Sequence, residues 1–327
     1  MQIARTLLAT ATAVGLSLAL TVPARAQSAA DFPNKPITLV VPFAAGVSAD
    51  LLFRGLAEAA SKHLGQSIII DNKSGGSGTL GPAQVAATAK PDGYTLVQIP
   101  LPVFRLPHMQ KTTFDPVKDF TYVILLAGYQ LGAVVKAESP YKKWQDVIDF
   151  AKANPGKFTY ATIGAATSPN IAMELASRES GMKMTHIPSK GGGESIAALL
   201  GDHVNMIVES PAWAPLEAAG QLRVLLMLGS EREKSWPDTP VLKEAGYSFD
   251  FDSPTGLAGP KGMDPAIVQK LHDAFKKAYD DPKMTDHYQK IQFSRRYANS
   301  ADYTALAAKL FASEKAFVDT LGLAKKD

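Results

Sequence analysis

The chain has 327 residues, of which 46% are hydrophobic and 20% are charged, and its formal net charge is +3 at pH 7. This near-balance of charge argues against a nucleic-acid surface, which needs a clustered basic excess. The chain contains no cysteine, which excludes disulfides, thiolate metal sites and cysteine nucleophiles.

The first 26 residues have the pattern of a secretory signal peptide. A basic start at Arg5 precedes an uncharged apolar run over residues 7–22, and Ala24-Arg25-Ala26 forms a small-x-small cleavage site. The run is shorter than the roughly 20 residues that a bilayer span needs, so an uncleaved N-terminal anchor is the weaker alternative. We predict cleavage after Ala26, and removal of 26 of the 327 residues leaves a periplasmic chain of 301 residues.

Short β-branched runs alternate with amphipathic stretches along the rest of the chain, which is typical of βαβ units. In the N-terminal part, strands are predicted over 37–42, 67–71 and 94–99, and helices over 48–64 and 82–89. The alternation resumes further on, with strands predicted over 158–163, 185–187, 204–208 and 222–228, and helices over 168–176, 194–200 and 211–219. The pattern therefore predicts two lobes, each with a parallel sheet.

Two extended segments are predicted to connect these lobes. Residues 123–135 cross from the first lobe to the second, and residues 247–259 return, before final helices over 264–278 and 300–321. The predicted division assigns residues 27–126 plus 249–327 to lobe 1 and residues 127–248 to lobe 2. The predicted fold class is α/β, with two Rossmann-like lobes joined by two crossing strands.

Three turns between a strand and a helix are rich in small or hydroxylic residues, at 43–48, 164–168 and 189–193. Such turns let a ligand approach the amides of a helix N-terminus, whose partial positive charge favours an anion. Glycine and serine are also ordinary helix caps, so each turn alone indicates little. Their recurrence in both halves predicts one anion-binding cleft between the lobes.

The segment Gly76-Ser77-Gly78-Thr79-Leu80-Gly81 matches the dinucleotide pattern G-x-G-x-x-G. Four residues separate it from the preceding strand, and Gln98 stands near the end of the next strand where a ribose-binding acid is wanted. The chain also lacks the H-E-x-x-H and G-x-S-x-G patterns. We therefore predict no cofactor, no metal site and no catalytic set.

Several single side chains are candidates for a role in the cleft. Arg105, next to Phe104, lies among prolines after the strand 94–99, where its guanidinium either stays in water or offers a fork to a carboxylate. Lys190 is either a solvated loop charge or a cleft residue. Glu209 ends a predicted strand, and Trp213 beyond it belongs either to the core of lobe 2 or to the pocket wall.

Six motifs stand in a fixed order along the chain: Phe32-Pro33-Asn34-Lys35-Pro36-Ile37, Val41-Pro42-Phe43-Ala44-Ala45-Gly46 with Ser48 and Asp50, Pro91-Asp92-Gly93-Tyr94-Thr95-Leu96, Phe114-Asp115-Pro116-Val117-Lys118-Asp119-Phe120, Lys190-Gly191-Gly192 and Leu199-Leu200-Gly201. Their sequence and spacing resemble those of the periplasmic solute-binding proteins of tripartite tricarboxylate transporters. The resemblance implies a two-lobed periplasmic-binding-protein fold of type II. It also implies a monomer that captures an organic carboxylate for the integral-membrane permease subunits of a transporter.

In that family the ligand carboxylate is held by the turn after the first strand and a facing turn of the second lobe, which correspond here to 43–50 and 164–170. Together with the single candidates above, the predicted ligand-binding residues are Phe43, Ala45, Gly46, Ser48, Asp50, Phe104, Arg105, Gly164, Ala166, Thr167, Ser168, Asn170, Lys190 and Glu209. Val47, Ala166 and Asn170 replace residues that are usual in the family. The first turn is therefore expected to be either less strained or differently bent.

We hypothesise that Ser48 and Ser168 face one carboxylate and that Arg105 binds a second, which makes the ligand a dicarboxylate, aliphatic or aromatic. Solute capture for transport accounts for export, two lobes, opposed turns and the lack of a catalytic set. A ligand-sensing partner of a membrane receptor would use the same cleft. An exported enzyme on this fold would need a base and a nucleophile that the sequence does not show.

Overall fold

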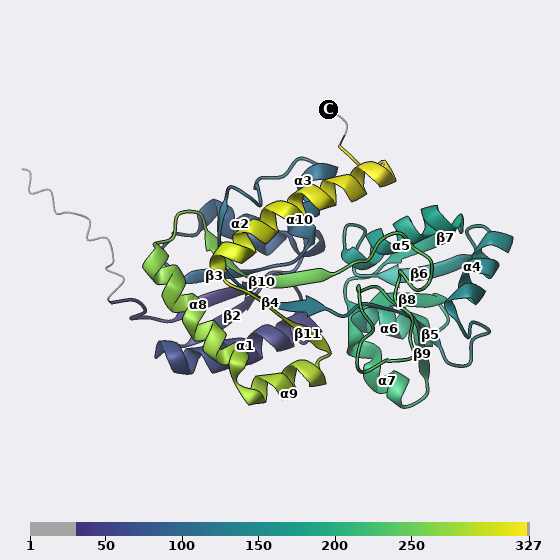
Figure 1. Ribbon diagram of the computed structural model, residues 1–327, viewed down its shortest axis with the longest axis horizontal. Helices are drawn as coiled ribbons and strands as arrows, with labels where there is room; N and C mark the ends of the chain where they lie inside the picture. The colour runs from purple at the N-terminus through teal and green to yellow at the C-terminus, as the bar shows by residue number, and fades with distance from the viewer. Residues whose placement is uncertain (1–30, 326–327) are drawn as a thin grey trace, which may run out of the picture.

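The computed structural model of the protein describes residues 31–325, and the chain forms two α/β lobes that lie next to each other (Figure 1). The predicted signal peptide lies outside the described residues. One lobe is built on a six-stranded sheet and the other on a five-stranded sheet. Within residues 31–325, no helix has both the length and the apolar character that a membrane crossing needs.

The first sheet begins with three parallel strands, β1 (Ile37–Val41), β2 (Ile68–Asn72) and β3 (Thr95–Ile99). Helices α1 (Ser48–Leu64) and α2 (Leu80–Thr88) connect them, with the short 3-10 helix η1 (Gly76–Gly78) before α2. Because Leu52, Leu56 and Ala60 recur every four residues, they share one face of α1 and are buried in the lobe core.

Three antiparallel strands complete this sheet: β4 (Phe120–Tyr129), β10 (Ser253–Pro260) and β11 (Phe293–Ala298). The resulting strand order is β11-β4-β10-β3-β1-β2. Four further helices pack on the lobe, namely α3 (Pro102–Met109), α8 (Pro265–Asp280), α9 (Pro282–Lys290) and α10 (Ser300–Leu321). Helix α10 extends past its own lobe to reach α5 (Ser168–Ser180) of the other (Figure 1).

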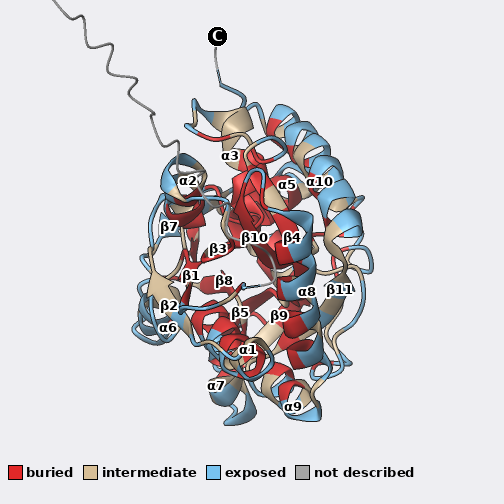
Figure 2. Ribbon diagram, turned by 90° about the vertical axis from the view of Figure 1, so that its left-hand side faces the viewer, coloured by how far each residue is buried: buried red, intermediate tan, exposed pale blue. Residues whose placement is uncertain are grey.

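The second sheet contains β5 (Gly132–Lys136), β6 (Phe158–Thr162), β7 (Met184–Pro188), β8 (Met206–Glu209) and β9 (Leu222–Met227), in the order β7-β6-β8-β5-β9. Its helices are α4 (Trp144–Ala153), α5 (Ser168–Ser180), α6 (Gly192–Leu200) and α7 (Ala214–Ala218), with the 3-10 helix η2 (Pro211–Trp213) before α7. Trp213 packs on Trp236 in the lobe core and is fully buried. The buried strands lie at the centre, and the helices around them have exposed outer faces (Figure 2).

The chain changes sheets twice, at the two predicted crossings. Strand β4 ends at Tyr129 in the first sheet and β5 begins at Gly132 in the second, while the return joins the first sheet at Ser253. Both changes lie a few residues beyond the predicted lobe boundaries at 126/127 and 248/249, which stay a prediction. The predicted α/β two-lobed fold is confirmed, but the prediction of a parallel sheet in each lobe is wrong: both sheets are mixed, because the crossing strands β4, β10 and β5 pair antiparallel with their neighbours.

Candidate functional site

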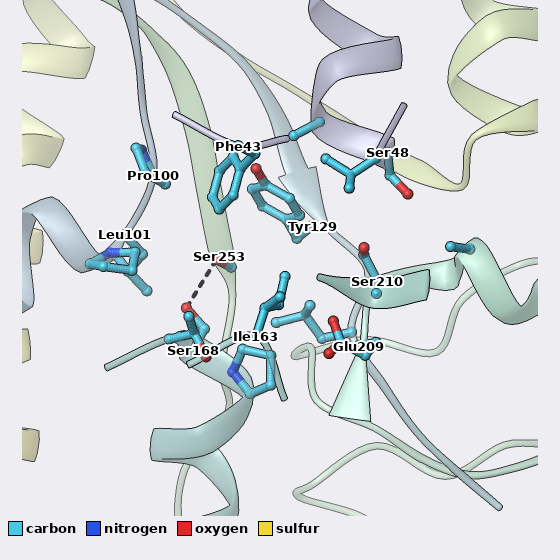
Figure 3. A pocket seen from close by; sticks show the side chains of 18 of the residues that line it. Phe43, Ser48, Pro100, Leu101, Tyr129, Ile163, Ser168, Glu209, Ser210 and Ser253 are labelled. Carbon is cyan, nitrogen blue, oxygen red and sulfur yellow. Dashed lines mark hydrogen bonds between the residues drawn. The ribbon is translucent and has the colours of Figure 1, made fainter. Parts of the chain in front are cut away.

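A cavity of about 350 Å³ lies between the lobes, and both lobes contribute to its walls (Figure 3). Its size falls in the range of roughly 300–1,000 Å³ that small-molecule sites occupy. The walls are largely apolar, with Phe43 and Leu101 from the first lobe and Ile163 from the second. Tyr129 and Ser253, from the two crossings, also line the cavity, so the site sits where the lobes are joined.

Three helices that follow the predicted turns begin at this cavity, α1 at Ser48, α5 at Ser168 and α6 at Gly192, and α3 begins there as well, at Pro102. Among the described residues, no side chain caps the N-termini of α1, α5 and α6. The same holds for α2 and α7, whose residues do not line the cavity, whereas α8, α9 and α10 are capped by the side chains of Asp264, Asp281 and Asn299. Since the first amides of a helix have no partner within it, the cavity receives uncapped, partly positive helix ends from both lobes.

The turn before α1 is shaped by Asp50, which does not itself line the cavity. Asp50 is 1% exposed and accepts hydrogen bonds of 2.8 Å from the amide of Gly46, from Arg54 and from Asn72. Burial raises the pKa of Asp50, but these hydrogen bonds outweigh it and hold the pKa below its ordinary value. The carboxylate therefore fixes the turn in its ionised form.

Val47, which replaces a usual family residue, fits this turn without strain. Gly46 takes the left-handed φ of 84°, which favours glycine, whereas Val47 has an extended backbone with φ −75° and ψ 162°. Of the two alternatives for this turn, the less strained one is found.

The glycine-rich segment 76–81 supports the cavity wall. Gly78 has a φ of 89°, and a Cβ there would lie 3.0 Å from the ring of Phe43 and 3.2 Å from Pro100. A side chain at this position would push both cavity residues, which explains the glycine in terms of close packing.

The facing turn before α5 is held by its own hydrogen bonds. Thr167 donates from Oγ1 to the carbonyl of Gly164 at 2.7 Å, and Asn170 donates to the hydroxyl of Tyr160 at 2.9 Å. Thr167 and Ser168 line the cavity, whereas Gly164, Ala166 and Asn170 do not. The last three residues therefore position the turn instead of forming the cavity wall.

The two serines that were expected to face one carboxylate lie on different sides of the cavity (Figure 3). Ser168 shares a hydrogen bond of 3.2 Å with Ser253 on one side. Ser48 lies on the other side, toward Ser210, and Tyr129 is seen between the two sides. The cavity thus has two polar ends separated by apolar and aromatic groups.

Glu209, at the end of β8, brings a carboxyl group to the cavity wall although it is only 2% exposed. Its Oε1 accepts a hydrogen bond of 2.9 Å from Ser195, whose hydroxyl also bonds to that of Ser189 at 2.6 Å. Burial raises the pKa of Glu209 to about 8, against the smaller opposing effect of hydrogen bonds from Ser195 and the amide of Ile163.

Arg105 takes a different place from the one expected, because residues 102–109 form helix α3 and not an irregular exit from a strand. Its side chain is 0% exposed and does not line the cavity. Nε donates to Glu314 of α10 at 2.5 Å, and Nη1 donates to the carbonyl of Ala166 at 2.7 Å. Arg105 therefore joins α3, α10 and the second-lobe turn from outside the cavity lining, and its buried Nη2 has no hydrogen-bond partner among the described residues.

Of the predicted site residues, six line the cavity: Phe43, Gly46, Ser48, Thr167, Ser168 and Glu209. The eight others do not: Ala45, Asp50, Phe104, Arg105, Gly164, Ala166, Asn170 and Lys190. Phe104 is buried against Tyr122, with ring centroids 6.2 Å apart, and Lys190 is exposed. Sequence reasoning missed Tyr129, Leu131 and Ser253, although the predicted crossings pass between the lobes and could have pointed to them.

A two-lobed α/β fold with an anion-friendly cavity between the lobes defines a solute-binding protein. Residues 52–323 match the family described as "Tripartite tricarboxylate transporter family receptor", and the chain belongs to this family. It is 49% identical to the "UPF0065 protein in gbd 5'region" of Cupriavidus necator, over 99% of this chain and 98% of that protein.

Two solved structures from Rhodopseudomonas palustris are similar over most of the chain. One is a protein solved with adipate, at 27% identity and a TM-score of 0.83, covering 90% of this chain and 99% of that one. The other is MatC with bound malate, at 27% identity and a TM-score of 0.79, covering 88% of this chain and 100% of that one.

Proposed function

We propose that this protein captures an organic carboxylate in the interlobe cavity and delivers it to the integral-membrane subunits of a tripartite tricarboxylate-type transporter. The convergence of uncapped N-termini of α1, α5 and α6 on one cavity carries this proposal, because such helix ends favour anions. Family membership supports the transport partner. The protein acts in the periplasm as a monomer, after removal of residues 1–26.

A dicarboxylate is the ligand that suits the two polar ends of the cavity. One carboxylate would meet the N-terminus of α1 with Ser48, and the other the N-terminus of α5 with Ser168 and Ser253. The body of the ligand would lie against Tyr129. Adipate and malate, in the two R. palustris structures, are both dicarboxylates, which supports this choice. In this proposal helix ends and hydroxyls, not Arg105, bind the second carboxylate.

We propose capture without chemical change because no serine in the cavity wall has an adjacent general base that would activate it as a nucleophile. Among the described residues that line it, the hydroxyl of Ser168 is bonded to Ser253, and there is no histidine, lysine or aspartate to activate a serine. Glu209 is hydrogen-bonded to Ser195, which does not line the cavity.

A matched ligand series tests both levels of the proposal. We would measure melting temperature and calorimetric affinity with adipate, with hexanoate, which lacks one carboxylate, and with 1,6-hexanediol, which lacks both. We expect adipate to bind best, because it carries a carboxylate for each polar end of the cavity. At 100 times its Kd it should stabilise the protein by about 2.7 kcal/mol. Hexanoate should bind at least about tenfold more weakly, and the diol not at all.

The possible outcomes test carboxylate capture and the preference for a dicarboxylate independently. If adipate and hexanoate bind equally, the dicarboxylate proposal fails while carboxylate capture stands. If no organic acid in a broad aliphatic and aromatic set stabilises the protein, capture itself is refuted. Proton NMR of the recovered ligand after long incubation would reveal turnover, which capture alone does not produce.

A further inference from the structure

Glu209 is an acid in the wall of a cavity that suits anions. Among the described residues that line the cavity, Glu209 is the only acidic side chain, and none of them is lysine, arginine or histidine. At 2% exposure its carboxyl group has little access to solvent that would screen it. An ionised Glu209 would therefore repel the carboxylate that the site is proposed to bind.

Within residues 31–325, the groups around Glu209 offer it hydrogen bonds but no positive charge. Ser195 on α6 donates to Oε1, and the amide of Ile163, just after β6, also bonds to the carboxyl group. Of the other titratable groups nearby, Glu194 on α6 accepts from the amide of Lys190, and Lys190 is exposed. Tyr129, at the crossing, is neutral and accepts from Gln98 at 2.7 Å.

The small size of the cavity makes the conflict unavoidable. Any ligand that fills about 350 Å³ brings its atoms within a few ångströms of every wall. An ionised Glu209 and a ligand carboxylate beside it, with no helix N-terminus or cation between them, would repel each other strongly, as two aspartates in one active site do unless they share a proton. Either Glu209 is neutral in the complex, or the ligand carries a positive group that faces it.

We propose that Glu209 is a specificity-determining residue that binds the ligand as the neutral acid, donating a hydrogen bond to an anionic oxygen, so that the carboxylate and a proton are held together. The proton comes from solvent and stays on the carboxyl group of Glu209. This proposal rests on the proposed capture of a carboxylate. The raised pKa of Glu209, about 8, agrees with it because the group then carries its proton at neutral pH.

The affinity for adipate is expected to depend on pH in a defined way. Kd should be constant at low pH and rise by up to tenfold per pH unit above the pKa of Glu209 in the free protein, which gives about tenfold at pH 9 relative to pH 6 for a pKa of about 8. Adipate itself stays doubly ionised over this range because aliphatic carboxyl groups titrate near pH 4 to 5. Calorimetry in two buffers of different ionisation heat should show nearly one proton taken up at pH 9.

Glu209→Gln is the matched control, because glutamine keeps the shape and a donor but cannot ionise. It should bind adipate at pH 6 within about threefold of wild type, with no pH dependence and no proton uptake at pH 9. A wild-type affinity that does not change between pH 6 and 9 would overturn the proposal. So would tighter binding of 2-aminoadipate than of adipate, which would identify Glu209 as a ligand for an ammonium group.

A titration of the free protein decides the protonation state independently of any ligand. Carbon-13 NMR of glutamate carboxyl groups, with the Glu209 signal assigned from its loss in Glu209→Gln, should show a neutral carboxyl group at pH 6.5. Glu209→Asp supplies the assignment if the glutamine variant does not fold. An ionised carboxyl group at pH 6.5 refutes the proposal. If adipate gives no heat at any pH, the dicarboxylate proposal fails while this titration still decides the state of Glu209.

Discussion

Replacing Arg105 by alanine is predicted to lower stability and ligand affinity together. Arg105 and Glu314 are 0% and 2% exposed, so the change leaves a buried carboxyl group without its partner. Breaking a buried pair in this way costs about 3–5 kcal/mol. In the wild-type protein, Arg105 also donates a hydrogen bond to the carbonyl of Ala166, which joins the two lobes next to the turn that lines the cavity. The substitution removes this bond. A bond to a charged group contributes about 1.5–3 kcal/mol, which corresponds to roughly 10- to 150-fold in Kd.

The stability loss should depend on pH because Arg105 sets the protonation of Glu314. Burial raises the pKa of Glu314, and the charge and hydrogen bond of Arg105 oppose that effect. Without Arg105 the pKa rises further, and a buried acid with a raised pKa destabilises the fold progressively as the pH rises from its ordinary pKa to the raised one, and by a constant amount above that. The deficit of Arg105→Ala relative to wild type should therefore be smaller at pH 5 than at pH 8.

Thermal melts and calorimetry with adipate check this prediction. At about 2–4 °C per kcal/mol, Arg105→Ala should melt roughly 6–20 °C below wild type. The double variant Arg105→Met with Glu314→Leu should recover much of that loss, since it leaves no buried charge. Arg232→Ala is the control, because its pair with Glu244 is exposed, and it should leave the melting temperature nearly unchanged. An Arg105→Ala protein that melts and binds like wild type would refute the role given to this contact.

Three further substitutions test the site, and one mass measurement tests the mature N-terminus. Ser48→Ala and Ser168→Ala should each weaken adipate binding by about 1–3 kcal/mol in calorimetry with little change in melting temperature; the reverse result would make that serine only a structural residue. Asp50→Asn should lower the melting temperature at pH 7, and the gap to wild type should close as the pH falls through the lowered pKa of Asp50, where wild type loses the charge as well. Intact mass of the periplasmic protein should begin at Gln27 or its cyclised form; a full-length chain in the membrane fraction would contradict cleavage.

The parts of the site that the sequence predicts are those that local signals specify. Small residues at 43–48 and 164–168 stand between a β-branched run and an amphipathic run, and each marks the end of a parallel strand. Because the carboxyl ends of parallel strands lie along one edge of a sheet, two such turns predict a shared cleft. Gly46, Ser48, Thr167 and Ser168 follow from this reasoning without knowledge of any long-range contact.

The errors concern residues whose surroundings come from distant parts of the chain. Arg105 and Glu314 are 209 positions apart, so their pairing leaves no local trace. Prolines at 102 and 107 made the exit from the strand look irregular, yet Pro102 is accepted in the first turn of a helix, where its missing amide has no partner to lose, and Pro107 lies inside the helix. Tyr129 and Ser253 lie in apolar crossing strands and look like ordinary core residues until both sheets are placed.

The uncapped starts of α1, α5 and α6 have a consequence for how the protein signals its state. In an open protein, water can accept hydrogen bonds from these amides, but between closed apolar walls only an anionic guest supplies enough acceptors. Closure of the empty cavity would leave several of these amides without a hydrogen-bond acceptor, and it is disfavoured for that reason. In the proposed transport role, the outline formed by both lobes would therefore report occupancy, and a membrane subunit that touches both lobes would distinguish a loaded carrier from an unloaded one without contacting the ligand.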